Sequence, residues 1–488
     1  MKQISVETYH PTMRTLSDDQ IHEIHQASLT ILEQTGIDLE DPEALDLVTG
    51  HGATIGPRKR VHIPTFLVQD ALAAAPRRIP MHDRLGQLTM PLALGKVFFG
   101  TGSDTIFTLD VETGQRRRAV ANDVHDIARL CDALPNIDFN MSMANPSDVP
   151  SSDQYVHEFI QMMRGSVKPM IVTTDSLQDV EDIWRIAAAV AGSDQLLRQR
   201  PFFLAYLEPI SPLRFARDSV QRLLFLAEKR IPVNYVPSPN MGAGGPVTMA
   251  GAIALANAEC LAGLVLAQLK SRGTPFLYGA NVSSLDMRTT VICYGPPEWM
   301  LSMAALADMA RFYGLPVWGY GGATDAKTLD AQAGLEAALS IYTSFLSRNT
   351  LVHDVGYLEM GYTSSMEMIV LVDEIIGMVR YIVDGVPVTE TSLALEAIDR
   401  AQAGSGFLAD DHTLENWRHA QFIPRFLNRQ RFQQWDAAGR PELFDRLNQA
   451  ARKILAEHEV PPLPEAAEEE IARVLKERGR HHAEEEEG

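Results

Sequence analysis

Short apolar segments with the alternation of β-strands recur along most of the chain, and each is followed by a segment with helical spacing. The first begins at Val97 and the last at Leu351, and successive segments start 30 to 43 residues apart. Eight such units predict an α/β fold of the (β/α)8 TIM barrel type, since a doubly wound open sheet would need fewer strands. The segments read VFFGTGSD, DFNMSMAN, PMIVTTD, FFLAYLEP, PVNYVPSPN, PFLYGANVS, PVWGYGG and LVHDVGYLE.

Regions of different character flank the repeated units. At the N-terminus, Ser17 and Gln20 form a capping box, Gly36 ends the helix that follows, and a second helix is predicted from Pro64 to Ala75. We therefore expect a helical N-terminal cap and, after the barrel, a helical C-terminal extension rich in aromatic residues. The predicted boundaries are 1–95 for the cap, 96–385 for the barrel with a β-hairpin at 106–120, 386–462 for the extension, and 463–488 for a solvated, polar and acidic tail.

Charge and composition exclude several classes of protein. The formal net charge of −20 argues against nucleic-acid binding, which requires clustered Lys and Arg. The N-terminus lacks the basic and apolar regions of a secretory signal, and the three cysteines form no CxxC pair, so we expect a cytoplasmic protein without a thiolate metal site. The apolar run Met249–Leu269 contains Asn257 and Glu259, which predicts a buried helix rather than a membrane span.

In a (β/α)8 barrel the residues that follow the strands share one pocket. Here that pocket is predicted to be acidic and aromatic, which suits a cation without hydrogen-bond donors. The same strand tyrosines could instead fill a barrel core, and alternation requires some of them to face the outer helices. The residues at these positions include Asp104, Tyr206, Glu208, Tyr320, Asp325, Lys327, His353 and Tyr357.

Two of these residues allow several interpretations. Lys327, beside Asp325, could be a Schiff-base nucleophile, an anion binder or a structural partner of the aspartate. His353 is a histidine at a strand end, where it could orient a substrate carboxylate or satisfy a buried hydrogen bond. His22 and His25 share a helix face but lack a third ligand, so no metal site is predicted.

Three long segments, in order, resemble the trimethylamine methyltransferase family of corrinoid-dependent enzymes: FFGTGSDTIFTLDVETGQRR from Phe98, GYGGATDAKTLDAQAGLE from Gly319, and GFLADDHTLENWR from Gly406. The resemblance implies transfer of a methyl group from an amine to the cobalt of a separate corrinoid protein. The trimethylamine-specific members contain pyrrolysine, whereas this chain has only the twenty standard residues. Members without pyrrolysine resemble demethylases of quaternary amines, with glycine betaine as the leading substrate.

On this hypothesis, Asp104, Glu208 and Asp325 are candidates to balance the ammonium charge. The aromatic walls would be Tyr206, Tyr320 and Tyr357, and the substrate carboxylate would be held by Lys327, His353 or Gln332. The cofactor would be a corrinoid carried by the partner protein, and the aromatic C-terminal region favours a homo-oligomer. Two alternatives remain open, namely a Schiff-base lyase that uses Lys327 and a quaternary-amine binding protein without turnover.

Overall fold

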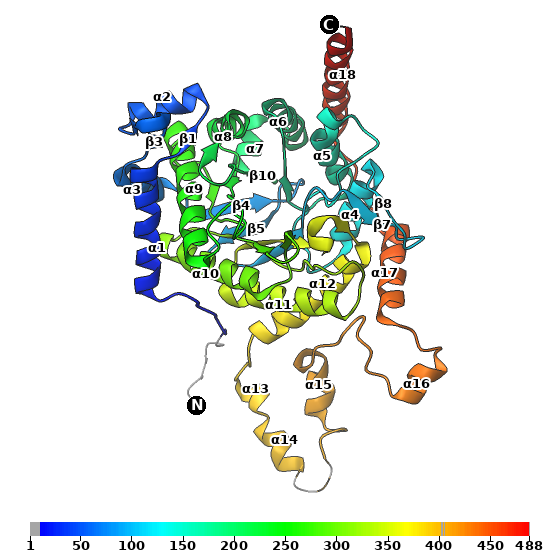
Figure 1. Cartoon of the computed structure of the whole chain (residues 1–488). Coiled ribbons are helices and arrows are strands. Elements are labelled where there is room, and N and C mark those ends of the chain that lie inside the picture. The colour runs from blue at the N-terminus through cyan, green and yellow to red at the C-terminus, as the bar shows by residue number, and fades with distance from the viewer. Residues whose placement is uncertain (1–9, 402–403, 405, 488) are drawn as a thin grey trace.

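The protein has a mixed α/β fold, built on a ring of parallel strand segments with helices outside it (Figure 1). The computed structural model describes residues 10–401, 404 and 406–487. Within these residues, parallel ladders join β9, β10, β12 and β13 in one group and β16, β17 and β6 in another. Their bounds are β6 Phe98–Thr101, β9 Met170–Val172, β10 Phe203–Leu207, β12 Val233–Tyr235, β13 Phe276–Leu277, β16 Trp318–Tyr320 and β17 Leu351–Val355.

Parallel bridges connect the two groups on both sides. Phe139 and Asn140 form the missing second segment, through bridges from Gly100 to Phe139 and from Asn140 to Met170. On the other side, Tyr278 bridges to Val317, next to β16. The pairings therefore pass through all eight of the strand segments predicted from the sequence and return to β6. We refer to these segments as the parallel ring.

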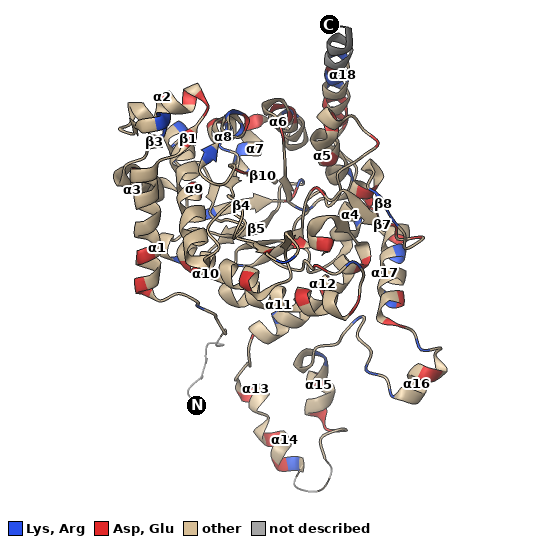
Figure 2. Cartoon of the chain, in the orientation of Figure 1, with Lys and Arg blue, Asp and Glu red and all other residues tan. Residues whose placement is uncertain are grey.

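Helices surround the parallel ring, and the longest of them, α9, is largely apolar. Helix α9 carries few charged residues (Figure 2). It is long and apolar enough to cross a membrane, but 83% of its most apolar stretch is buried inside the protein. Gly263 lets it approach the ring of Tyr235, where a Cβ atom would lie 2.6 Å from a ring carbon. The surrounding helices are α4 Ala121–Ala133, α5 Gln154–Gly165, α6 Leu177–Ala191, α7 Asp194–Gln199, α8 Arg217–Lys229, α9 Met249–Lys270, α10 Pro297–Tyr313, α11 Ala331–Ser347 and α12 Met366–Val383.

The N-terminal helices pack beside α9. The predicted capping box is confirmed, since Ser17 Oγ accepts from the N–H of Gln20 at 3.2 Å and the Gln20 side chain accepts from the N–H of Ser17 at 2.9 Å. Within this helix, Ser28 accepts a hydrogen bond from Asn257 of α9. The elements are α1 Asp18–Thr30, η1 Ile31–Thr35, β1 Asp38–Leu39, α2 Pro42–Gly50, β2 Thr54–Ile55, η2 Pro57–Lys59, β3 Val61–His62 and α3 Thr65–Ala74, and β1 pairs with β11 Arg214–Phe215.

A β-hairpin that the sequence interpretation did not include closes the amino end of the parallel ring. Strands β4 (Arg78–His82) and β5 (Leu88–Ala93) pair antiparallel. Alternate residues of both strands, Ile79 and Met81 among them, are fully buried in the core cluster that fills the ring. The N–H of His82 donates to Pro201, just before β10, which fixes the hairpin at this end.

Two further hairpins lie in loops after strands of the ring. The predicted first-loop hairpin is confirmed as β7 (Phe107–Leu109) and β8 (Arg116–Arg118). Strand β7 also pairs with β19 (Thr363–Ser364), which pairs in turn with β18 (Tyr357–Leu358). The second hairpin, β14 (Ser284–Asp286) with β15 (Val291–Cys293), follows β13, and we call it the 284–293 hairpin. Short 3-10 turns occupy η3 Ser151–Asp153 and η4 Glu359–Gly361.

The C-terminal tail is more ordered than its composition suggests. Helix α18 packs along α6, with Ala467, Ile471 and Val474 buried between them. Buried Arg478 donates to Asp179 at 2.8 Å and to Asp182 at 2.7 Å, both on α6. The prediction of a solvated tail is therefore wrong for this helix. The C-terminal helices are α13 Glu390–Leu393, α14 Leu395–Arg400, α15 Asp411–Ala420, α16 Phe432–Ala437, α17 Leu443–Glu457 and α18 Glu465–Glu487.

Candidate functional site

A cavity of about 420 Å³ lies where the strands of the parallel ring end at their carboxyl termini. Six of the nine residues singled out from the sequence line it, and they come from four different strands or the loops that follow them. Further lining residues come from helices α5 and α8 and from the 284–293 hairpin. The lining includes Asp104, Tyr155, Thr173, Thr174, Tyr206, Glu208, Arg222, Asn281, Ile292, Tyr294, Tyr320, His353, Asp354 and Tyr357.

Aromatic rings form one wall of the cavity. Trp318 packs behind the wall, with its ring centroid 4.2 Å from that of His353 and 5.2 Å from that of Tyr206. The ring of Tyr320 lies 4.5 Å from His353. Trp318 and Tyr320 share the inner face of β16 because side chains alternate along a strand, while Gly319 between them faces Asn349.

Other strand tyrosines point away from the cavity. The hydroxyl of Tyr278 donates to Asn257 of α9 at 2.7 Å, and that of Tyr235 accepts from Ser219 of α8 at 3.0 Å. Both rings therefore belong to the interface between the ring and its helices, as alternation requires for some of these residues.

Two polar atoms on the aromatic wall have no hydrogen-bond partner in the described part of the chain. They are the hydroxyl oxygen of Tyr320 and Nε2 of His353, and both are buried. The other ring nitrogen of His353, Nδ1, lies against the carboxylate of Asp354. Buried polar atoms are nearly always paired, so the two unpaired atoms mark positions where a ligand or water would bind.

Two carboxyl groups predicted from the sequence face the same cavity. Asp104, in a left-handed conformation with φ of 56°, accepts a hydrogen bond from Thr173 at 3.0 Å. Glu208 accepts from the hydroxyl of Tyr206 and from Ser238 at 3.3 Å. The surrounding protein raises the pKa of both carboxyls, although Glu208 is exposed to the cavity. A cation bound beside either carboxyl would oppose this rise in pKa, so both positions favour a cationic ligand.

A third carboxyl lies deeper, on α5. Glu158 is 2% exposed, and its Oε1 has no hydrogen-bond partner among the described residues. Burial raises the pKa of Glu158 well above its ordinary value, and the nearby charge of Asp104 raises it further. Since two adjacent carboxylates repel, we expect a proton on Glu158 while Asp104 is ionised.

Arg222 is the residue of opposite charge in the cavity, and the sequence interpretation missed it. It lies on α8, and its guanidinium donates to the Thr174 carbonyl and, at 3.2 Å, to the Thr174 hydroxyl. Burial lowers its pKa, with the charge of Asp175 opposing this effect. An arginine remains charged, so the cavity presents carboxyls and a guanidinium to the same ligand.

The remaining predicted residues lie outside the cavity. The carboxylate of Asp325 accepts hydrogen bonds from the backbone N–H groups of Tyr294 at 2.8 Å and Gly295 at 3.0 Å. Burial raises the pKa of Asp325, and these two hydrogen bonds oppose the rise. Lys327 is exposed and donates to the Asp325 carbonyl at 2.8 Å, while Gln332 is exposed and donates to Glu336 at 2.9 Å. None of the three faces the aromatic wall.

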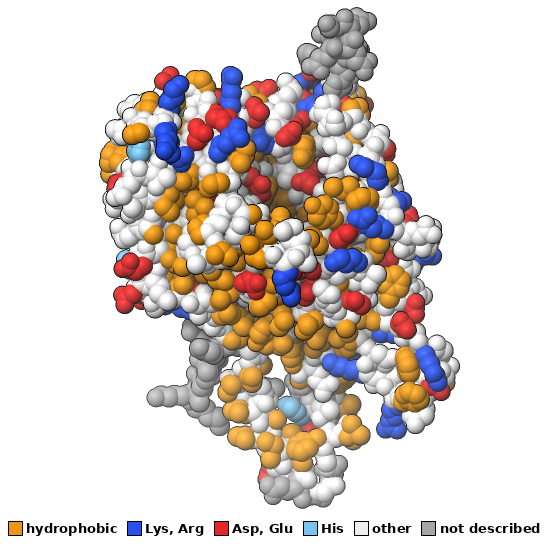
Figure 3. Space-filling view, viewed as in Figure 1, with side chains coloured by type: hydrophobic (Ala, Val, Ile, Leu, Met, Phe, Trp, Pro, Cys, Tyr) orange, Lys and Arg blue, Asp and Glu red, His pale blue; other side chains and the backbone are white. Residues whose placement is uncertain are grey.

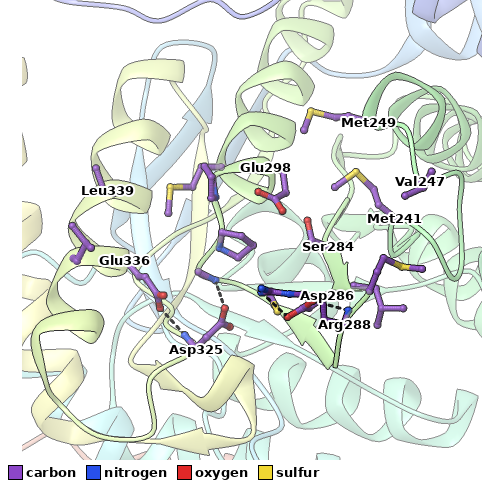
Figure 4. Close-up of a pocket in the computed structure, with 18 residues that line it drawn as sticks. Met241, Val247, Met249, Ser284, Asp286, Arg288, Glu298, Asp325, Glu336 and Leu339 are labelled. Atoms are coloured by element: carbon purple, nitrogen blue, oxygen red, sulfur yellow. Dashed lines mark hydrogen bonds and ion pairs between the residues drawn. The ribbon is translucent and has the colours of Figure 1, made fainter. Parts of the chain in front are cut away.

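Asp325 instead borders a second, larger cavity of about 930 Å³ on the other side of the 284–293 hairpin (Figure 4). In this close-up the carboxyl of Glu336 points toward the backbone of Asp325, whose N–H donates to it at 2.8 Å. The hairpin therefore separates the two cavities. Ile292 and Tyr294 face the first, and Cys293 and Gly295 face the second.

Several lining residues had little signal in the sequence. Arg222 and Tyr155 lie on helices, so a search limited to the residues after strands could not include them. Asp354 follows His353 on β17, and alternation along a strand predicts that their side chains point to opposite faces. The φ of Asp354 is 81°, which interrupts the regular strand. Both side chains therefore line the cavity. A group of three His, Cys, Asp or Glu able to hold a metal ion is absent from the described residues.

Comparisons with known proteins agree with the resemblance noted from the sequence. The trimethylamine methyltransferase (MTTB) family model matches residues 1–483. A trimethylamine methyltransferase from Desulfitobacterium hafniense is 31% identical over 450 residues, which cover 92% of this chain and 90% of that protein. A glycine betaine methyltransferase from another strain of the same species is 29% identical over 479 residues, covering 97% and 99%.

A solved structure supports the same fold. The monomethylamine methyltransferase from Methanosarcina barkeri aligns with a TM-score of 0.51 at 14% identity, covering 92% of this chain and 89% of that one. At this identity the likeness concerns the fold alone. The family model, by contrast, spans nearly the whole sequence, and on that ground the chain belongs to the trimethylamine methyltransferase family.

Proposed function

We propose that the protein is a corrinoid-dependent methyltransferase that demethylates a quaternary amine, with glycine betaine as the leading substrate. The observation that carries the proposal is one cavity with an aromatic wall, two carboxyls whose pKa is raised, and a guanidinium. A small zwitterion with a methylated ammonium matches all three features. The glycine betaine methyltransferase of D. hafniense, which aligns along nearly its full length, supports the choice.

We also propose that the parallel ring is a (β/α)8 barrel. The continuous circle of parallel pairings supports this, as do helices that follow the strands around the ring. In that architecture the carboxyl ends of the strands are the usual place for an active site. The cavity lies at that end, and the β4–β5 hairpin closes the other.

The ammonium group of the substrate would lie against Tyr206, Tyr320 and His353. A quaternary ammonium has no hydrogen to donate, so it binds through the faces of aromatic rings and through nearby negative charge. Glu208 and Asp104 supply that charge from the neighbouring wall. Since burial raises the pKa of both carboxyls, a bound cation would favour their ionised forms and lower those pKa values again.

The carboxylate group of the substrate would bind Arg222. Its Nε donates to the Asp218 carbonyl at 3.2 Å and its Nη1 to Thr174, so Nη2 is the nitrogen that would donate to a carboxylate. Arg222 reaches the cavity from α8 and is held by Thr174. Lys327 and Gln332, proposed from the sequence for this role, lie outside the cavity, and His353 lies on the aromatic wall.

This chain has three tasks in methyl transfer, namely desolvating the substrate cation, aligning one N–CH3 bond and admitting the partner. A reduced corrinoid carried by a separate protein supplies the electron pair that accepts the methyl group. The leaving group is a neutral tertiary amine, so no proton has to be transferred. The positive charge is dispersed in the transition state, so a carboxylate held too close would stabilise the charged substrate more than the transition state. We therefore assign a larger share of the rate enhancement to the aromatic wall than to the carboxylates.

An experiment with free cobalamin tests the proposal without the native partner. The full chain is incubated with cob(I)alamin and, in separate reactions, glycine betaine, proline betaine, carnitine or trimethylamine, and the absorbance change of methylation is followed. We expect methylcobalamin with at least one quaternary amine and release of the matching tertiary amine. Binding by calorimetry without methylcobalamin, with either free cob(I)alamin or a corrinoid protein, would instead indicate a binding protein.

The observations give no support to the Schiff-base alternative. Lys327 is exposed and its Nζ donates to a backbone carbonyl. The half-buried Lys168 donates to three backbone carbonyls at 2.6 to 2.7 Å, which is a structural arrangement. On the separate question of location, Cys131, Cys260 and Cys293 are all free thiols. Free thiols are typical of a reducing compartment, and we propose the cytoplasm.

A further inference from the structure

The second cavity, of about 930 Å³, adjoins the candidate active site but has a different lining. Four methionines and four aliphatic side chains form its apolar part. In Figure 4, Met241 and Val247 lie on one side of the space and Leu339 on the other. The apolar lining residues are Met241, Val247, Met249, Leu285, Met287, Met300, Leu335 and Leu339.

Several of these apolar side chains are exposed to solvent. Val247 is 65% exposed, Met287 64% and Leu335 62%. Figure 3 shows apolar side chains gathered over α9, α10 and α11, and each of these helices contributes residues to the wall of the cavity. Exposed apolar side chains around a cavity are typical of a binding surface, and methionine side chains adapt to ligands of irregular shape.

The wall of this cavity also contains a buried polar atom without a partner. Ser284 is 7% exposed, and its Oγ has no hydrogen-bond partner in the described part of the chain. Asp286 and Glu298 line the same cavity and add carboxylate acceptors. The lining therefore suits a large ligand with an apolar body and hydrogen-bonding groups at its edge.

The 284–293 hairpin separates this cavity from the candidate active site, and its base is firmly held. On one side, the Ser283 carbonyl accepts from the N–H of Met241 at 2.9 Å. On the other side, the carboxylate of Asp325 accepts from the N–H of Tyr294 at 2.8 Å. The ring of Tyr294 also stacks on that of Trp299, with the centroids 5.1 Å apart. These contacts fix both ends of the hairpin.

The tip of the hairpin has mostly local contacts. Asp286 accepts from the N–H groups of Arg288 at 2.8 Å and Thr290 at 2.7 Å, both within the hairpin. Val291 is 39% exposed, and Ile292, which lines the candidate active site, is 37% exposed. Exposed side chains and local hydrogen bonds offer little resistance to displacement, so the tip can move while the base stays in place.

We propose, on the basis of the proposed function, that residues 286–292 form a flap that swings aside, and that the corrin ring of the partner protein then occupies the second cavity. In methyl transfer the cobalt has to reach a methyl group held at the aromatic wall. The candidate active site, at about 420 Å³, is sized for a small amine and not for a macrocycle as well. Displacement of the flap joins it to the larger cavity.

The chemistry of a corrin ring matches the lining of the second cavity. The ring has apolar faces and carries carboxamide groups around its edge. Methionine and aliphatic side chains pack against such faces, and the unpartnered hydroxyl of Ser284 and the carboxylate of Glu298 would bind the carboxamides. Because Tyr294 is held at the base of the hairpin, it stays at the amine when the flap opens. Amine binding thus needs the first cavity alone, and corrin binding needs the second.

Equilibrium dialysis of the full chain against methylcobalamin, without an amine, tests the occupant of the second cavity. A double variant, Val247→Asp with Leu335→Asp, is expected to bind methylcobalamin about tenfold or more weakly than the wild type, because the corrin ring would desolvate both carboxylates. Its affinity for glycine betaine, measured by calorimetry, should not change, since neither residue lines the candidate active site.

Leu85→Asp with Leu88→Asp is the matched control. It adds the same two charges at positions that are 53% and 56% exposed, in the β4–β5 hairpin that closes the amino end of the parallel ring. This variant should bind methylcobalamin as the wild type does. Equal weakening in the two double variants would show that added charge, rather than the second cavity, controls corrin binding, and would overturn the proposal.

Amide hydrogen exchange tests the flap itself. Saturating methylcobalamin is expected to speed exchange in residues 286–292 severalfold, whereas glycine betaine alone should not. Unchanged exchange in this segment overturns the proposal, as does a wild type that binds neither methylcobalamin nor a corrinoid protein. These measurements involve no methyl transfer. Failure of the proposed function, in which no quaternary amine yields methylcobalamin, can therefore be told apart from failure of the flap.

Discussion

Asp325 fixes the position of Tyr294, because its carboxylate accepts the backbone N–H of Tyr294 at 2.8 Å while the side chain of Tyr294 lines the candidate active site. The sequence suggested Asp325 as a charge partner of the substrate. In the structure it faces the second cavity and acts on the site through the 284–293 hairpin. We therefore treat Asp325 as a positioning residue.

Asp325→Ala is expected to reduce methyl transfer by about ten- to a hundredfold, since small displacements of a site wall cost that much. Asp325→Asn keeps one oxygen acceptor and should lose less. Lys327→Ala is the control, because Lys327 is exposed and its Nζ donates to the backbone carbonyl of Asp325. Steady-state rates with cob(I)alamin and glycine betaine measure the effect. Wild-type rates in Asp325→Ala would show that the hairpin does not depend on this carboxylate.

Arg222→Gln should affect only substrates that carry a carboxylate. Hydrogen bonds to a charged group contribute about 1.5 to 3 kcal/mol, so we expect glycine betaine to bind roughly ten- to a hundredfold more weakly. Choline has the same ammonium group without the carboxylate, and its affinity should not change. Calorimetry with both ligands measures the difference. An equal loss for the two would mean that Arg222 supports the fold of the site rather than the carboxylate.

Two substitutions at Tyr320 separate the ring from the hydroxyl. Tyr320→Leu removes the aromatic face, and cation–π contacts contribute about 0.5 to 2 kcal/mol, so we expect roughly three- to thirtyfold weaker binding of the quaternary ammonium. Tyr320→Phe keeps the ring and removes a hydroxyl that has no partner among the described residues, so it should bind nearly as well as the wild type. Identical affinities for the leucine variant and the wild type would remove Tyr320 from the ammonium site.

Glu259 predicts a pH dependence of stability. Burial in α9 raises its pKa to about 7, although the N–H of Leu213 and the hydroxyl of Ser211 donate to it. In the unfolded chain its pKa is about 4.3. The folded state thus holds a proton that the unfolded state has lost, and stability falls as pH rises from about 4.3 to 7, by about 4 kcal/mol in total for this group.

Glu259→Gln removes this contribution. Its free energy of unfolding by urea, measured from pH 5 to pH 8, is expected to depend less on pH than that of the wild type. The variant should therefore gain stability relative to the wild type toward pH 8. Parallel curves for the two proteins would show that Glu259 does not titrate in this range.

The sequence predicted the order of the strands, and six of the nine residues singled out from it line the cavity. Asp104, Glu208 and His353 lie within a few residues of a strand, where backbone geometry leaves little freedom. Asp325 follows β16 by five residues, enough for the chain to turn its carboxylate toward the 284–293 hairpin. Arg222 reaches the cavity from the second turn of α8, and nothing in the residues after β10 indicates its direction.

The C-terminal region shows what composition alone does not predict. Its aromatic residues favoured a homo-oligomer, and in the single chain Phe432 is 64% exposed and Trp417 40%. Composition predicts that such side chains need to be covered and does not say by which surface. Conversely, the acidic character of α18 concealed Arg478, which joins three aspartates and holds this helix on the body.

The most direct test of the central claim is the reaction of the full chain with cob(I)alamin and glycine betaine, with methylcobalamin followed by absorbance and dimethylglycine measured in the same samples. The account predicts both products in equal amounts, and a large loss of both in an Arg222→Gln and Tyr320→Leu double variant. If no quaternary amine yields methylcobalamin, with free cob(I)alamin or with a corrinoid protein, the proposed function is contradicted.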